Sequence, residues 1–141
     1  MIVIVGIISV VATARISTGF AETRGLYDKL LSQVQYAHKA AVAQRRAVFV
    51  RIDAAQSRLC YSAAGTCTAG DAVASPTGDV PFSVAIPATI AVNPAVTFQF
   101  DSAGRYRTSA GAATITPLVI TVTGDGTLQF TVEHDTGFVH S

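Results

Sequence analysis

The residues of this sequence that could do chemistry are few, and their spacing favours structural roles. His134 and Asp135 are adjacent, so in a strand their side chains would point to opposite faces and could not form a dyad directly; a turn is the favoured interpretation. Asp101, Glu133 and Asp135 could be imagined as paired carboxylates, but turns commonly carry Asp because its side chain caps backbone N–H groups. His38 lies on a predicted helix and is interpreted as a surface or interface residue. We therefore expect no enzyme, no catalytic residue, no metal ligand and no cofactor.

Known catalytic and nucleotide-binding motifs are also missing from the sequence. It contains no G-x-S-x-G elbow, P-loop, dinucleotide fingerprint, H-E-x-x-H motif or EF-hand loop. The net charge of +1 gives no electrostatic footprint for non-specific binding of nucleic acid. A basic stripe of Lys39, Arg45, Arg46, Arg51 and Arg58 is interpreted as a solvated face.

Two cysteines, Cys60 and Cys67, close a short loop that contains Gly65. A turn could bring both sulfurs together, so a disulfide is favoured over two free thiols in a reduced compartment. The spacing is wrong for a C-x-x-C redox pair, and two cysteines alone cannot close a zinc site. A disulfide would imply an oxidising compartment such as a bacterial periplasm.

The amino-terminal run MIVIVGIISVVATA, residues 1–14, is uncharged and has no polar face. It is shorter than the roughly 20 residues that span a bilayer. It could be a signal-peptide core, a buried helix, or the end of a longer membrane segment. No basic residue precedes it, and a domain of this size would have to surround its Val and Ile on every side. We favour a membrane segment and expect the chain to continue upstream.

Residues 15–46 show the period of an amphipathic helix. The apolar positions recur at three and four residues, and the polar ones are assigned to other faces. The apolar set is Leu26, Leu30, Val34, Ala37 and Ala41, and the polar set is Glu22, Arg24, Asp28, Lys29, Gln33 and Lys39. The first proline is Pro76, so both segments could form one helix of about 40 residues, softened at Gly6, Gly19 and Gly25. Such a helix exceeds a single-domain core, so its first part must pack in lipid or against other subunits.

Residues 47–141 alternate in the manner of strands. Val48, Val50 and Ile52 share one face, and Gly124-Asp125-Gly126 is a strong hairpin signal. Strands are expected at 48–52, 58–62, 82–86, 96–100, 118–123 and 127–133, with a loop over 63–80. The sequence thus predicts an α+β fold, with one long helix packed on an antiparallel sheet of about five to seven strands.

Four segments together resemble the GspH/FimT family of type II secretion pseudopilins and type IV minor pilins. They are the apolar run, the segment YDKLLSQVQYAHKAAVAQRRAVFV, the turn Phe100-Asp101-x-x-Gly104-Arg105, and the closing Val132-Glu133-x-x-Thr136-Gly137-Phe138-Val139-His140. They span nearly the whole chain. The cysteine pair and the terminal TGFVH are most similar to MshC-type minor pilins of the mannose-sensitive haemagglutinin pilus. The family's basic leader, cleavage-site glycine and early glutamate are not in this sequence, and we expect them upstream.

The resemblance implies a structural subunit of a type IV pilus or a type II secretion pseudopilus, in filament initiation or at the tip. Residues 1–14 would be held in the inner membrane and then pack in the filament, and residues 15–141 would form a periplasmic head. The helix-packing residues would be Ile2, Val3, Ile4, Val5, Ile7, Ile8, Val10 and Val11. The implied partners are other major and minor pilins or pseudopilins, the membrane, and the inner-membrane assembly platform.

Two alternatives remain open. One is a DNA-binding minor pilin of natural transformation, although the tail TGFVHS has no Lys or Arg. The other is a soluble periplasmic adhesin or enzyme, which predicts signal-peptide cleavage near residues 12–14.

Overall fold

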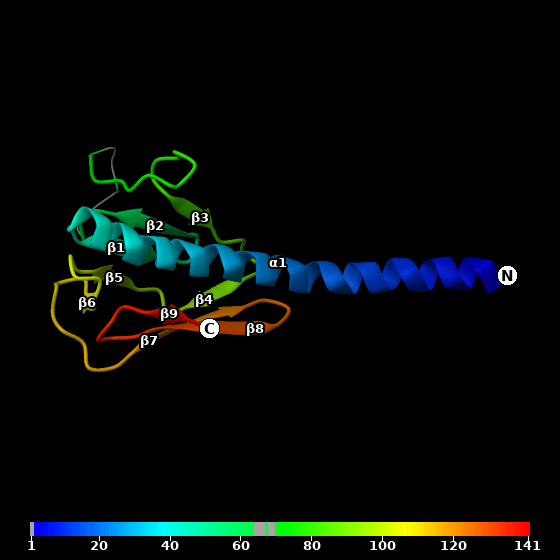
Figure 1. Cartoon of the computed structure of the whole chain (residues 1–141). Helices are drawn as coiled ribbons and strands as arrows, with labels where there is room; N and C mark the ends of the chain where they lie inside the picture. The colour runs from blue at the N-terminus through cyan, green and yellow to red at the C-terminus, as the bar shows by residue number, and fades with distance from the viewer. Residues whose placement is uncertain (1, 64–66, 68–69) are drawn as a thin grey trace.

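The computed structural model describes residues 2–63, 67 and 70–141, with side chains from residue 19 onward in those ranges. Its first element is the 43-residue helix α1, Ile2–Gln44. The predicted apolar and amphipathic segments therefore form one continuous helix, about 65 Å long at 1.5 Å per residue. Figure 1 shows that only its second half runs along the head, while the N-terminal half extends away from it. The side chains of residues 2–11, which are predicted to pack in the membrane or the filament, are not among those that the structure describes.

The rest of the described chain forms two antiparallel sheets. Their strands are β1 (Val48–Ile52), β2 (Gln56–Cys60), β3 (Ser83–Ala85), β4 (Ala91–Asn93), β5 (Thr97–Phe100), β6 (Tyr106–Thr108), β7 (Leu118–Thr123), β8 (Thr127–Val132) and β9 (Val139–His140). One sheet has the order β3-β2-β1-β5-β6 and the other the order β4-β7-β8-β9. The α+β class is confirmed, but the prediction of a single sheet was wrong because local patterns do not show which strands pair.

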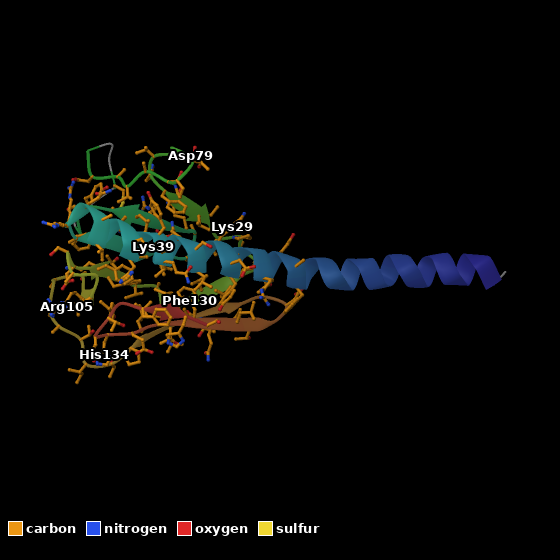
Figure 2. All side chains as sticks on the ribbon, viewed as in Figure 1. Lys29, Lys39, Asp79, Arg105, Phe130 and His134 are labelled. Atoms are coloured by element: carbon orange, nitrogen blue, oxygen red, sulfur yellow. A yellow bond between two sulfur atoms is a disulfide. The ribbon has the colours of Figure 1, made fainter. Side chains whose placement is uncertain are left out.

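The amphipathic pattern of the helix places its apolar face in the core. Leu30, Val34, Ala37 and Ala41 are fully buried and Leu26 nearly so, as the spacing predicts. They pack against inward-facing residues of both sheets, among which Phe98, Phe100 and Phe130 are also fully buried. Figure 2 shows Phe130 on the sheet beside the helix. Burying each such side chain contributes roughly 1.5–3 kcal/mol, so this face fixes the helix to the head.

The predicted turn at 124–126 closes the β7–β8 hairpin. Thr123 pairs with Thr127, and the N–H of Gly124 donates to the carbonyl of Gly126 at 2.9 Å. The tip of this hairpin then packs on the helix, where the N–H of Asp125 donates to the hydroxyl of Thr23 at 3.3 Å. Contacts between the head and α1 therefore extend back along the helix to Thr23. This residue lies close to the point where α1 leaves the head (Figure 1).

Candidate functional site

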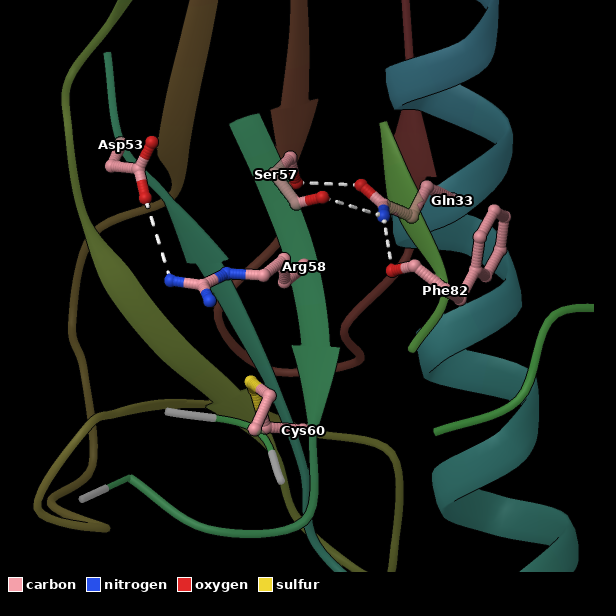
Figure 3. Close-up of a disulfide and its surroundings, with 7 residues drawn as sticks. Gln33, Asp53, Ser57, Arg58, Cys60 and Phe82 are labelled. Atoms are coloured by element: carbon pink, nitrogen blue, oxygen red, sulfur yellow. Dashed lines mark hydrogen bonds and ion pairs between the residues drawn. A yellow bond between two sulfur atoms is a disulfide. The ribbon is translucent and has the colours of Figure 1, made fainter. Parts of the chain in front are cut away.

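The helix is fixed in register on the head by a buried polar side chain, Gln33. Its Nε2 donates to the carbonyls of Ser57 and Phe82, at 3.2 and 3.0 Å, and its Oε1 accepts from the Ser57 hydroxyl at 2.6 Å (Figure 3). Gln33 is fully buried, so its assignment to a polar helix face was wrong. It lies three residues after Leu30 and seven after Leu26, which is the spacing of the core face.

The turn after β5 is organised by the carboxylate of Asp101. Its Oδ1 accepts from the backbone N–H groups of Ala103 and Arg105, at 3.0 and 2.9 Å. Its Oδ2 accepts from the Nε atoms of Arg105 and Arg107, at 3.2 and 3.1 Å. Asp101 therefore pairs with two arginines, Arg105 and Arg107. Gly104, at φ +83°, completes the turn by donating to the Asp101 carbonyl at 2.8 Å.

Electrostatics favours the charged form of Asp101. Burial alone would raise the pKa of this carboxyl, but hydrogen bonds from the Arg105 backbone, the Arg107 side chain and the Ala103 backbone outweigh it. They lower the pKa of Asp101 below its ordinary value. The turn is thus stabilised by an ionised carboxylate, which is a structural role.

The closing turn before β9 is built in a similar way. The N–H of Gly137 donates to the carbonyl of Glu133 at 3.0 Å, and the N–H of Glu133 donates to the carbonyl of Phe138 at 2.9 Å. The hydroxyl of Thr136 accepts from the N–H of Phe138 at 3.2 Å. Gly137 has φ +67°, a left-handed conformation that L-residues with side chains rarely adopt.

These two turns, which are far apart in the sequence, meet on the helix at His38. A Cβ atom on Gly137 would overlap the carbonyl oxygen of Gly104 and lie 2.9 Å from the His38 ring. Nε2 of His38 lies 3.2 Å from the carbonyl oxygen of Thr136, and its ring packs edge-on against Phe100 with 5.3 Å between centroids. Both glycines therefore permit close backbone contact, and His38 joins the turns to α1. No local pattern in the sequence predicts this contact.

The two remaining histidines, His134 and His140, each lie close to a carboxylate. Nε2 of His134 lies 3.3 Å from Oδ2 of Asp135, an exposed group. These residues lie in a turn, as predicted, and in a turn the two adjacent side chains can meet. Nε2 of His140 lies 2.8 Å from Oε1 of Glu133, and this hydrogen bond raises the pKa of His140 above its ordinary value.

Cys60 and Cys67 are joined by a disulfide, with their Cα atoms 5.4 Å apart (Figure 3). Together with Phe49 and Ala47 they form a small apolar cluster separate from the main core. Phe49 alternates with Val48 and Val50 and so lies on the opposite face of β1, where this cluster buries it. The disulfide therefore lies on the outer face of the first sheet, beside Phe49.

The predicted basic stripe is divided among different elements. Arg46 lies over the ring of Tyr61, 3.8 Å from its centroid, and Arg58 pairs with Asp53 at 3.6 Å (Figure 3). Lys39 is exposed on the helix. Arg46 and Arg58 thus contact neighbours on the head and do not form an open track for a polyanion.

The described parts of the chain hold neither a cluster of metal ligands nor a membrane-spanning helix. Residues 2–63, 67 and 70–141 contain no group of three His, Cys, Asp or Glu side chains placed to hold a metal ion. Within these described ranges, no helix is both long and apolar enough to cross a membrane. The predicted membrane segment, residues 1–14, lies outside the described side chains.

Comparison with known proteins identifies the class of fold. No protein-family model and no curated protein matches the sequence. Two crystal forms of the type IV minor pilin FimU from Pseudomonas aeruginosa strain PAO1 match the structure. The P21 form has a TM-score of 0.58 at 18% identity and covers 85% of this chain and 87% of that chain. The P65 form has a TM-score of 0.56 at 17% identity and covers 83% and 90%.

The chain therefore has a pilin-like α+β fold, similar to that of a type IV minor pilin. At this level of identity the likeness concerns the fold. It agrees with the pilin-like architecture that the sequence predicts.

Proposed function

We propose that this chain is a structural subunit of a type IV pilus or of a type II secretion pseudopilus. One observation carries the proposal: a pilin-like head is attached to a helix much longer than the head needs. Residues 19–23 of α1 lie against the tip of the β7–β8 hairpin. Ahead of them the backbone of α1 continues for about 25 Å and extends away from the head (Figure 1).

The amino-terminal half of α1 would serve in two environments. It would hold the subunit in the inner membrane, with a periplasmic head, and then pack with the helices of other pilins or pseudopilins in the filament. Lipid tails and neighbouring apolar helices are similar surroundings for Val and Ile, so transfer between them involves little change in burial. Each head would then lie at the filament surface, and the inner-membrane assembly platform would be the partner during transfer.

The finer assignment, to the GspH/FimT family with MshC-type pilins nearest and a place in initiation or at the tip, is part of the same proposal. It is supported by the way the Phe100–Arg105 turn and the Glu133–Gly137 turn pack on the helix. The contact at Gly104, Gly137 and His38 gives both sequence motifs one structural purpose, which is to hold the head on α1.

The proposal is tested by locating the protein in the bacterium that makes it. We expect the full-length chain in the inner-membrane fraction and in sheared surface filaments or the pseudopilus. A variant that lacks residues 1–18 should keep the head but be lost from both fractions. Accumulation of the full-length chain as free periplasmic protein would contradict the proposal.

A further inference from the structure

Strand β3 forms an edge of the five-stranded sheet and carries backbone groups without partners. The carbonyl of Phe82 and the N–H of Ile86 bond to the β1–β2 hairpin, at 3.1 and 2.8 Å. Because backbone groups alternate in direction along a strand, those of Ser83 and Ala85 point away from the sheet. Among the described residues, no hydrogen bond satisfies these outward groups. Unpaired groups on an edge strand are a template for another extended chain.

A groove runs between this edge and the helix. It consists of two adjoining hollows of about 500 and 360 Å³, which share Lys29 and Ala85. The first also contacts Asp28, Ser32 and residues 82–84, and the second contacts Glu22, Gly25, Leu26 and Pro87. The groove therefore runs beside the whole of β3, from Phe82 to Pro87.

Charge favours a carboxylate in the first hollow, beside Lys29, and disfavours one in the second hollow, where Glu22 has no basic partner among the described residues. Asp28 is already paired with Arg24, at 3.6 Å between Oδ1 and Nε. Lys29 lines both hollows, and within the described part of the chain it has no carboxylate partner. In an added strand the residue opposite Val84 would point to the helix side of the sheet, towards Lys29.

Prolines limit the length of the edge. Pro81 precedes β3 and Pro87 follows it, and neither has an N–H group to donate. The edge can thus pair only a few residues, which suits a specific short strand and opposes open-ended aggregation.

We propose that this groove binds an extended segment of a neighbouring subunit that carries one carboxylate, and that the segment adds as a strand next to β3. Main-chain hydrogen bonds to Ser83 and Ala85 would hold the segment, and a carboxylate opposite Val84 would pair with Lys29. This inference rests on the proposed function, because it takes the partner from the same filament.

The binding mode can be tested with a defined probe, the peptide acetyl-Thr-Val-Glu-Val-Thr-amide. We expect it, at millimolar concentration, to slow amide exchange of Ser83 and Ala85 roughly fivefold in the ¹⁵N-labelled full chain in detergent micelles. The same peptide with Lys or Pro in place of Glu should have less than about a twofold effect. Equal slowing by the Lys peptide would overturn the acidic preference, and no slowing by the Glu peptide would overturn the groove as a strand site.

Two matched tryptophan variants test the groove in the cell. Ser32→Trp fills the groove from the exposed side of the helix, whereas Ala43→Trp adds the same bulk at an exposed helix position outside it. We expect Ser32→Trp to reduce the amount of subunit in sheared filaments at least fivefold, with Ala43→Trp at the wild-type level and both variants melting like the wild type. Equal incorporation of both variants would refute the proposed binding of a subunit in the groove and leave the proposed function standing. Absence of the wild type from filaments would refute the proposed function itself.

Discussion

Replacing Gly137 with alanine tests the contact that joins the two turns to the helix. At φ +67° an alanine is strained by roughly 1–2 kcal/mol. Its Cβ would also overlap the carbonyl oxygen of Gly104, which belongs to the backbone of a second hydrogen-bonded turn. One turn must move, and the contact between His38 and Thr136 would be weakened at a further cost of about 0.5–1.5 kcal/mol. We expect Gly137→Ala to lower the free energy of unfolding by about 2–4 kcal/mol.

A matched variant separates backbone strain from the tertiary contact. Gly78 has φ +96°, but a Cβ there would have no atom within 4 Å. Gly78→Ala should therefore cost only the roughly 1–2 kcal/mol of conformational strain. Urea unfolding of the oxidised protein can be followed by tyrosine fluorescence, since the chain has four tyrosines and no tryptophan. If Gly137→Ala were no more destabilising than Gly78→Ala, the two turns would not be packed as described.

Three further predictions concern the buried glutamine, the histidine pair and the disulfide. Gln33→Ala leaves the carbonyls of Ser57 and Phe82 without their side-chain donor. It should lower the free energy of unfolding, measured by urea denaturation, by about 2–4 kcal/mol. A loss below about 0.5 kcal/mol would contradict the buried position of Gln33. The pKa of His140 is raised in the folded state, so the stabilisation from its pair with Glu133 should be fully present below the ordinary histidine pKa and be lost as pH rises through the folded-state pKa. In an NMR titration Glu133→Gln should bring that pKa back towards its ordinary value, and an unchanged pKa would exclude this pair as the cause. Intact mass under non-reducing conditions should be two hydrogens below that of the reduced chain, and two free thiols per chain would refute the Cys60–Cys67 disulfide.

The elements with strong periodicity could be predicted from the sequence. The recurrence of Leu26, Leu30 and Val34 defines the core face of the helix, and the alternation from Val48 defines β1. Both patterns reflect local geometry, in which side chains at fixed spacing share one face. Predictions based on residue type alone were weaker. Gln33 was placed on a polar face because it is polar, although its spacing puts it on the apolar one.

Short strands and tertiary contacts could not be predicted. β4 and β6 have three residues each and β9 has two, too few for an alternating pattern to be recognised. The division into two sheets depends on which distant strands pair, and strand composition does not specify this. The meeting of Gly104 with Gly137 likewise depends on how two separate hairpins pack on α1. The sequence showed both turns but not that they touch.

On the proposed function, the amino-terminal half of α1 packs against other subunits in a filament. A photo-reactive benzoylphenylalanine at Val11 of the full-length chain tests it most directly, by cross-linking in intact filaments and identifying the adducts by mass spectrometry. We expect adducts to the amino-terminal helices of other pilin-type subunits in the filament fraction. Recovery of the chain from that fraction without such adducts, or only as a free periplasmic protein, would contradict it.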